Sequence, residues 1–271
     1  NKDLSFSLGN EGYQLKVTSE KIMIEAADNA GLFYGITTLR QLFPAEVESG
    51  KIGSAFNIPA VNISDKPYYE WRGSMLDVAR SFFDLDYLKK HVDRMALYKL
   101  NRFHLHLSDD QGWRIEIKKY PKLTSVGSKR TETVAGHVLK SPVSLRIRKD
   151  VQEYDGIPHE GYYTQEEIKE VVAYASERFI TIIPEIDLPG HTSSLIAAYP
   201  EYGSSNKNIG VKTIWGIQED IIKPNENTFN FLKDVFTEIA DLFPSQYIHI
   251  GGDEANKKQW IESEEVQEIM K

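Results

Sequence analysis

The first 65 residues contain two short segments with strand-like patterns and one helical segment. Residues 13–17 alternate strictly between apolar and polar side chains, and residues 21–25 do so less cleanly, which predicts two neighbouring β-strands. Apolar side chains recur on one side from Leu32 to Leu42, which predicts a helix. The proline-containing stretch 54–67 is interpreted as a linker with one short strand. These elements predict a small α/β domain over residues 1–65, incomplete at its start.

From residue 71 onwards, short apolar segments alternate with amphipathic ones. The predicted strands cover residues 74–78, 102–107, 179–186 and 247–250. The predicted helices run from Asp84 to about Tyr98, from a capping box at Thr164 to about Arg178, and from a cap at Asn227 or Thr228 to about Phe243. Strands that alternate with helices are typical of parallel βαβ units. We therefore predict a second domain over residues 66–271.

Each predicted strand of this second domain is followed by polar side chains. They are Asp77 and Arg80, then Ser108-Asp109-Asp110, then Glu185, Asp187 and His191, and finally Asp253-Glu254. The carboxyl ends of parallel strands are where barrels and open α/β sheets place their sites. Four such clusters at equivalent positions favour an enzyme over a passive scaffold.

The last cluster, Gly251-Gly252-Asp253-Glu254, carries the most specific chemistry. Two glycines permit a sharp turn at a strand end, and the turn presents two adjacent carboxylates. Adjacent carboxylates repel each other, which favours retention of a proton by one of them, as a general acid requires. The alternative is that both residues cap a helix that begins at about Ala255. No Gly-rich nucleotide-binding pattern follows any predicted strand.

Histidines and tryptophans offer further candidates with two interpretations each. His104 and His106 share one face of their strand. They could form a metal pair, or they could be buried histidines that hydrogen-bond to neighbours, which is more common. His191 follows Pro189-Gly190 and could lie in an ordinary surface loop. Trp113, Trp215 and Trp260 could stack on a sugar face or belong to the core. We expect no metal site.

Composition narrows the function classes. The 271 residues include 32 Lys plus Arg and 40 Asp plus Glu, a net charge of −8. An acidic excess disfavours nucleic acid and anionic membranes as partners. The absence of cysteine excludes disulfides, thiolate nucleophiles and cysteine metal sites. The start at Asn1 is neither an initiator methionine nor a signal peptide, so we expect the chain to be part of a longer protein.

Taken together, these segments resemble glycoside hydrolase family 20, the β-N-acetylhexosaminidases. The similarity extends from about residue 13 to residue 260 and is carried by four motifs in order. They are RGSMLDVAR at 72–80, KLNRFHLHLSDDQGW at 99–113, IPEIDLPGH at 183–191 and YIHIGGDE at 247–254.

The resemblance implies an α/β fold in which a small α/β N-terminal domain is followed by the first half of a (β/α)₈ TIM-type barrel. It also implies a retaining exo-glycosidase that removes terminal β-linked N-acetylglucosamine or N-acetylgalactosamine without a cofactor. In this family the acetamido oxygen of the substrate is the nucleophile. A complete barrel has eight strands and four are predicted here, so we expect open sheet edges with exposed apolar side chains. Association with another chain is one way to complete the barrel.

The resemblance also implies roles for five residues. Glu254 would protonate the leaving glycosidic oxygen and later deprotonate water. Asp253 would bind the acetamido N–H and stabilise the oxazolinium intermediate. Arg80 would bind the 3- and 4-hydroxyls of the sugar, and Asp109 and His191 would support the site as polar neighbours.

Three other functions remain open from the sequence. A family member similar to a lacto-N-biosidase would release a disaccharide unit, and a catalytically incomplete or dead fragment would only bind carbohydrate. A metal-dependent carbohydrate esterase would use the histidines. The expected partner is an oligosaccharide or glycoconjugate with a terminal N-acetylhexosamine, with no nucleic acid and no membrane. Several motifs resemble those of secreted or periplasmic bacterial members, and the sequence does not determine the compartment.

Overall fold

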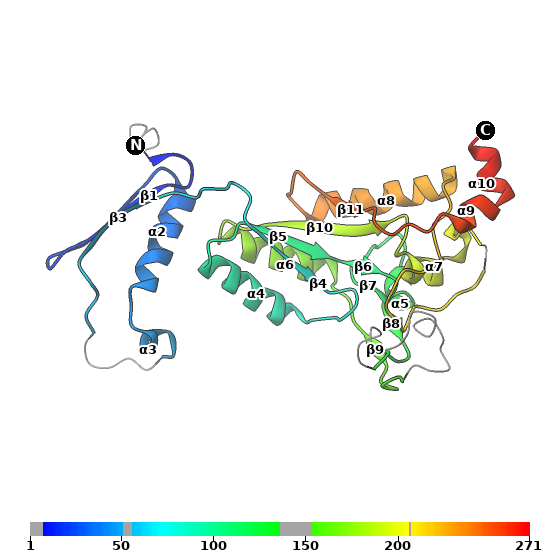
Figure 1. Ribbon diagram of the computed structural model, residues 1–271, viewed down its shortest axis with the longest axis horizontal. Helices are drawn as coiled ribbons and strands as arrows, with labels where there is room; N and C mark the ends of the chain where they lie inside the picture. Colours follow the sequence, from blue (N-terminus) through cyan, green and yellow to red (C-terminus); the bar gives the residue numbers. More distant parts are fainter. Residues whose placement is uncertain (1–7, 51–55, 136–152, 206) are drawn as a thin grey trace. The chain divides into compact units, whose positions relative to one another are not determined.

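The computed structural model describes residues 8–50, 56–135, 153–205 and 207–271 (Figure 1). The chain divides into two compact units. The first contains residues 1–74, 90–102 and 175–180, and the second contains residues 75–89, 103–174 and 181–271. No helix among the described residues is both long enough and apolar enough to cross a membrane.

The first unit contains a three-stranded antiparallel sheet in the order β2-β1-β3. The central strand β1 (Tyr13–Val17) pairs with β2 (Ile22–Ala26) on one side and with β3 (Val61–Asp65) on the other. Its residues alternate between buried and exposed, as predicted, because one face of the sheet meets the core. The one short strand predicted within the linker 54–67 is confirmed: it is β3, an edge strand of this sheet.

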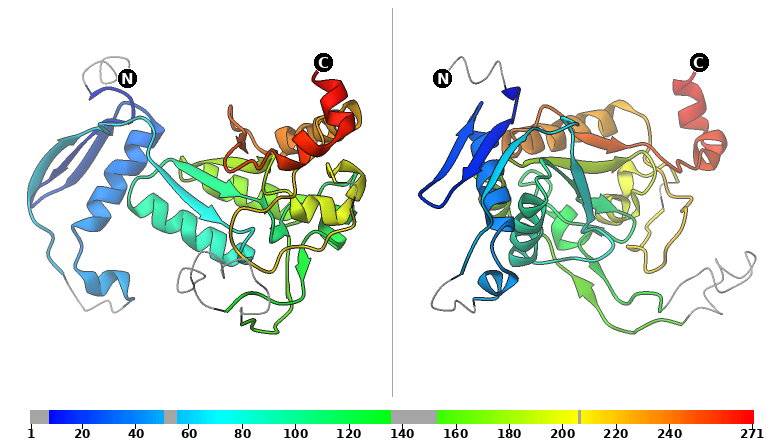
Figure 2. Two further views of the ribbon diagram at one scale, coloured as in Figure 1. Left: turned by 45° about the vertical axis from the view of Figure 1, so that its right-hand side comes forward. Right: turned by 60° about the vertical axis from the view of Figure 1, so that its left-hand side comes forward.

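Helix α2 (Asn29–Gln41) lies along the same sheet in both views of Figure 2. Tyr34 of the helix joins a buried cluster with Tyr13, Leu15 and Val17 of β1. The helix begins three residues before the predicted Leu32, because the side chain of Asp28 caps it and accepts a hydrogen bond from the Gly31 N–H at 2.7 Å. A short helix, α3 (Ala45–Glu48), follows Pro44.

A four-stranded sheet carries the predicted βαβ pattern. Its strands lie side by side in chain order as β4 (Gly73–Asp77), β5 (Arg102–His106), β10 (Thr181–Leu188) and β11 (His249–Gly251). β10 and β11 are parallel. The Val78 N–H donates to the His106 carbonyl at 3.2 Å, and the Leu107 N–H donates to the Glu185 carbonyl at 3.0 Å. These bonds tie the carboxyl ends of β4 and β5 to the next strand of the sheet, so the residues that follow the strands lie together.

The helices between these strands begin at capping side chains. In α4 (Leu85–Leu97) the Asp84 carboxylate accepts from the Tyr87 N–H at 2.8 Å, and in α6 (Gln165–Ser176) Thr164 and Glu167 form the predicted capping box. The predicted cap of α8 (Glu226–Leu242) at Asn227 or Thr228 is wrong. Asn225 caps this helix, because its side-chain oxygen accepts from both the N–H and the hydroxyl of Thr228.

Short elements fill the connections of the second unit. The strand pairs are β6 (Ser108–Asp109) with β7 (Gly112–Trp113) and β8 (Lys129–Arg130) with β9 (His159–Glu160). The short helices are α5 (Lys122–Ser125), α7 (Ser193–Ala198), η4 (Pro200–Tyr202), α9 (Lys258–Glu262) and α10 (Glu264–Ile269).

The two outer strands of the four-stranded sheet expose apolar side chains. Met75 on β4 is 48% exposed, and Ile250 on β11 is 57% exposed. In a closed barrel each strand has two neighbours, so there are no edge strands. The prediction of open edges is confirmed for the described part of the chain.

A buried arginine, Arg114, ties the loops beyond the sheet together. Its side chain is fully buried and donates hydrogen bonds to the carbonyls of Val78, Ala79, Ser128, Gly161 and Gln111. Burial and the nearby Arg130 lower its pKa to about 9. A β-carbon on Gly112 would lie 2.2 Å from the guanidinium, so this position needs glycine. Arg114 therefore connects the segment after β4 with the hairpin β6–β7 and with β9.

We predict that Arg114→Met destabilises the protein by about 3 kcal/mol or more, because several buried carbonyls lose their donors at once. Chemical denaturation monitored by tryptophan fluorescence measures the loss. Lys129→Met is the control, since the Lys129 side chain forms an exposed ion pair with Glu160 in the described part of the chain and its loss should cost less than about 1 kcal/mol. Equal stability of the two variants would contradict this assignment.

Candidate active site

A hollow of about 310 Å³ lies beyond the carboxyl ends of the strands of the four-stranded sheet. It is lined by Asp77, Arg80, Gln111, His191, Trp215, Gly216 and Glu254. These residues come from the segments after β4, β6, β10 and β11 and from the loop before α8. The parallel strands bring these distant segments together because their carboxyl ends share one edge.

Arg80 is held at one side of the hollow by three polar side chains. Its Nη1 donates to Asp77 Oδ2 at 2.8 Å, its Nη2 to Asp109 Oδ2 at 2.6 Å and its Nε to Gln111 Oε1 at 3.0 Å. Burial disfavours the charge, but the carboxylates of Asp109 and Asp77 outweigh it and raise the pKa of Arg80. The guanidinium is thus charged and fixed in direction.

His191 connects two buried carboxylates with Glu254. Its Nδ1 lies 3.1 Å from Asp110 Oδ2 and 3.2 Å from Asp109 Oδ1, and its Nε2 lies 3.1 Å from Glu254 Oε2. Hydrogen bonds to Asp109 and Asp110 raise the pKa of His191 to about 11, although burial opposes this. Ser193 fixes Asp110 in turn through its N–H at 3.0 Å. The interpretation of His191 as an ordinary surface histidine is wrong, since it is buried.

The turn after β11 presents Asp253 and Glu254. Gly251 and Gly252 have φ values of 67° and 104°, and Glu254 itself has a φ of 47°. A β-carbon on Gly251 would lie 1.7 Å from Asp187 Oδ1, so no other residue fits there. The Gly252 N–H donates to the same oxygen at 3.3 Å. Asp187 therefore holds the turn from below.

Neither carboxylate of this turn caps a helix. The next helix, α9, begins at Lys258, and its cap is Lys257. The alternative of a helix that begins at about Ala255 is wrong, because the left-handed backbone at Glu254 directs the chain away from a helical path. The side chain of Glu254 is 49% exposed and reaches the hollow. Asp253 is exposed, and its carboxylate lies within 4.8 Å of the polar atoms of Asp187 and His191.

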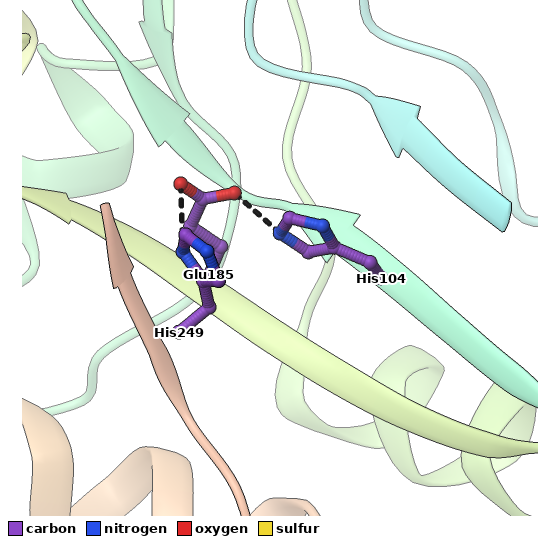
Figure 3. A group of neighbouring side chains, drawn as sticks. All are labelled: His104, Glu185 and His249. Carbon is purple, nitrogen blue, oxygen red and sulfur yellow. Dashed lines mark hydrogen bonds and ion pairs between the residues drawn. The ribbon is translucent and has the colours of Figure 1, made fainter. Parts of the chain in front are cut away.

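His104 and His106 share a face, as predicted, and both contact Glu185. His249 approaches the same carboxylate from the neighbouring strand β11 (Figure 3). Two histidines and a glutamate resemble a ligand set, but His104 and Glu185 are directly hydrogen-bonded. A tetrahedral zinc ion would hold its ligand atoms about 3.3 Å apart, so a metal would require these groups to separate. The arrangement favours hydrogen-bonded histidines over a metal pair.

The three tryptophans have different roles in the structure. Trp113 is buried and donates from Nε1 to the Ile115 carbonyl at 2.7 Å, and Trp260 donates to the Ile222 carbonyl at 2.8 Å. Trp215 alone of the three lines the hollow. Gln111 was not among the predicted site residues, yet its side chain accepts from Arg80 and donates to the Ile214 carbonyl at 2.9 Å. Its position directly after Asp110, in the polar segment that follows a predicted strand, was the feature of the sequence that indicated a site residue.

Comparison with known families agrees with the motifs. The model for the catalytic domain of glycosyl hydrolase family 20 matches residues 69–271, and the model for domain 2 of the same family matches residues 2–66. Together they cover nearly the whole chain.

Curated and structural relatives extend this result. The chain is 44% identical to a beta-hexosaminidase of Porphyromonas gingivalis, over 95% of this chain and 31% of the relative. A crystal structure of a beta-N-acetylhexosaminidase aligns with a TM-score of 0.84 at 42% identity, over 97% of this chain and 51% of the other. A mutant beta-hexosaminidase of Streptomyces plicatus in complex with product (GlcNAc) aligns with a TM-score of 0.80 at 37% identity, over 96% and 48%.

The chain thus spans 31% to 51% of the length of these relatives. Their fold confirms the predicted fold class, a small α/β domain followed by the first half of a (β/α)₈ barrel. From its sequence, its strand order and both family models, the chain belongs to glycoside hydrolase family 20.

Proposed function

We propose that this chain carries the proton donor and the sugar-binding arginine of a retaining β-N-acetylhexosaminidase. The observation that carries the proposal is that Arg80, His191 and Glu254 line one hollow and are linked through buried carboxylates. A hydroxyl-binding cation on one side and a proton donor on the other are what hydrolysis of a terminal sugar requires. The substrate is an oligosaccharide or glycoconjugate that ends in N-acetylglucosamine or N-acetylgalactosamine.

Glu254 is the proposed general acid and, in the second step, the general base. Its Oε2 faces His191 Nε2, and the exposed part of its side chain faces the hollow, where a glycosidic oxygen would lie. The imidazolium of His191 balances the charge of Glu254 when the proton has left. Asp110 and Asp109 keep His191 protonated and oriented, so that it acts as an electrostatic partner of Glu254.

Asp253 is the proposed partner of the acetamido group. As an exposed carboxylate next to Glu254, it is free to accept the acetamido N–H and to turn the carbonyl oxygen towards the anomeric carbon. The substrate then supplies its own nucleophile, and the negative charge of Asp253 stabilises the oxazolinium intermediate. An intramolecular nucleophile in good alignment can lower the barrier by several kcal/mol, up to about 7–11.

Arg80 is proposed to bind the 3- and 4-hydroxyls of the sugar. Asp77, Asp109 and Gln111 fix three of its N–H groups, so the guanidinium is oriented before substrate arrives. The conformational entropy of this long side chain is therefore lost on folding, and binding of the sugar does not have to order it. Pre-orientation of this kind favours affinity for the terminal sugar unit.

We predict that Glu254→Gln lowers kcat for chitobiose by at least about 10³-fold, because the leaving sugar then has no proton donor. An activated substrate such as the 2,4-dinitrophenyl glycoside should lose less, since its leaving group needs no protonation. Hydrolysis rates of both substrates by the longest natural protein that contains this sequence measure the difference.

The control for this experiment is Glu262→Gln, which changes an exposed carboxyl on α9, outside the hollow. Wild-type-like turnover by Glu254→Gln would contradict the assignment. Measurable GlcNAc binding without hydrolysis by the wild type would favour the carbohydrate-binding alternative, and release of a disaccharide unit would favour a lacto-N-biosidase.

We predict that Arg80→Lys raises KM and lowers kcat/KM by about 10²-fold, because lysine cannot hold two hydroxyls and three protein acceptors with one ammonium group. Affinity for the product GlcNAc should fall in parallel. Steady-state kinetics and isothermal calorimetry with GlcNAc measure the two effects. Unchanged GlcNAc affinity would exclude Arg80 from the sugar site.

Asp187 makes the stability of the site depend on pH. Burial, together with the neighbouring Asp109 and Asp253, raises its pKa to about 7 although His191 opposes this. A carboxyl whose pKa is higher in the folded state stabilises the fold at low pH, and this contribution is lost as pH rises through 7. We predict that Asp187→Asn flattens the decline of the melting temperature between pH 5 and pH 8. The same slope in both proteins would contradict the prediction.

A further inference from the structure

His106 lies outside the hollow, beneath Asp109, and its two ring nitrogens face two different carboxylates. Nε2 lies 2.8 Å from Asp109 Oδ2, and Nδ1 lies 2.7 Å from Glu185 Oε2. The side chains of His106, Asp109 and Glu185 are each at least 95% buried. The Nδ1 contact is a close ion pair without the alignment of a hydrogen bond. A neutral imidazole has one N–H and would turn an unprotonated nitrogen towards one of the two carboxylates, so their closeness favours the doubly protonated ring.

Asp109 is the residue through which His106 reaches the site. Its Oδ2 accepts from His106 and from Arg80 Nη2, while its Oδ1 accepts from the Asp110 N–H at 2.6 Å and faces His191 Nδ1. The buried Asp109 carboxylate thus contacts both Arg80, the proposed hydroxyl-binding residue, and His191, which contacts the proposed proton donor Glu254. Any rotation of this carboxylate would move both.

Glu185 holds His106 from the other side. Figure 3 shows His104 and His249 beside the same carboxylate, and neither of these histidines contacts Asp109 in the described structure. Burial would raise the pKa of Glu185, but hydrogen bonds from His104 and His106 lower it below its usual range. A permanently ionised Glu185 keeps the charge on His106.

We propose that His106 is a positioning residue: clamped as a cation between Glu185 and Asp109, it fixes the carboxylate that aligns both Arg80 and His191. This inference rests on the proposed hydrolysis of N-acetylhexosaminides. It assigns a function to His106, which does not line the hollow and whose ring nitrogens face Asp109 and Glu185.

The charged groups around His106 come from several elements. They are Asp77 and Arg80 at the end of β4, His104 on the same strand, Asp109 on β6, and Glu185 and Asp187 on β10. Carboxylates outnumber cations in this set. Removing the charge of His106 therefore leaves excess negative charge and raises the proton affinity of the neighbouring site groups.

Two substitutions separate the two contacts of His106. Asparagine places its amide near the position of Nδ1, so His106→Asn keeps a partner for Glu185 and loses Asp109. Glutamine reaches further, so His106→Gln keeps an N–H for Asp109 and loses the charge. His104→Asn is the matched control, because His104 lies on the same face of β5 and contacts Glu185 without contacting Asp109.

The experiment measures kcat and KM of the longest natural protein that contains this sequence, with chitobiose and the 2,4-dinitrophenyl glycoside, across pH. We expect His106→Asn to raise KM for both substrates and to lower kcat further for chitobiose, with kcat/KM down by about 10²-fold. His106→Gln should recover roughly ten-fold of this loss. Both limbs of the pH profile should move up by roughly half a pH unit in each His106 variant.

The control His104→Asn should stay within about three-fold of wild type with unmoved pH limbs, since it leaves Asp109 in place. A loss in His104→Asn equal to that in His106→Asn, or unmoved limbs in the His106 variants, would overturn the proposal. If His106→Asn does not melt cooperatively, the test rests on His106→Gln: shifted limbs of its pH profile support the proposal, and unmoved limbs overturn it. A wild type that does not hydrolyse either substrate would overturn the proposed function, and this inference with it.

Discussion

The charge balance around Asp109 is the constraint on which the candidate site depends. This carboxylate is fully buried, where an unpaired charge would cost several kcal/mol, yet its pKa is lowered to about 2 because hydrogen bonds from His106 and His191 and the charge of Arg80 outweigh burial. Its partners come from β4, β5 and the segment after β10. The charge can be accommodated only if those three segments meet, so the fold and the site are specified together.

Other residues at the carboxyl end of the sheet support the charged groups around Asp109 without pairing with them. Among the described residues, Arg114 pairs with no carboxylate and donates its hydrogen bonds to backbone carbonyls of the surrounding loops. Gly112 makes room for that guanidinium, and Gly251 makes room for Asp187 beside the turn that carries Asp253 and Glu254. Two glycines that look like ordinary turn residues are thus required by close approach of a side chain.

The carboxyls of the site differ in their response to burial. Asp109 stays ionised beside imidazoles and a guanidinium, and Glu185 stays ionised beside imidazoles. Asp187 forms no ion pair with a cation among the described residues, and burial raises its pKa to about 7. Burial acts on all three carboxyls, and their different charged neighbours give lowered pKa values at two positions and a raised one at the third. An ionised carboxylate, Asp109, therefore lies next to Arg80 and His191, whereas a carboxyl that titrates near neutral pH, Asp187, lies next to the turn that carries Asp253.

Much of this architecture was determined by the sequence itself. Alternation in β1, the cap at Asp84 and the capping box at Thr164 act over a few residues, so local pattern predicted their elements nearly to the residue. The order of strands and helices predicted that Arg80, Asp109, His191 and Glu254 would share one end of a sheet, and the motifs pointed to the family. The cap of α8 was misplaced by two or three residues because Asn225, Asn227 and Thr228 are all good capping residues, and only the packing of Thr228 selects Asn225.

Only the tertiary structure decided which partner each polar group takes. Which carboxylates His106 contacts, whether Trp215 or Trp113 lines the hollow, and whether Asp253 caps a helix depend on atoms supplied by strands far apart in sequence. Burial and charge are properties of that assembled surrounding, and no local pattern encodes them. The sequence thus determined which groups gather at the end of the sheet, and the three-dimensional contacts determined their protonation and their geometry.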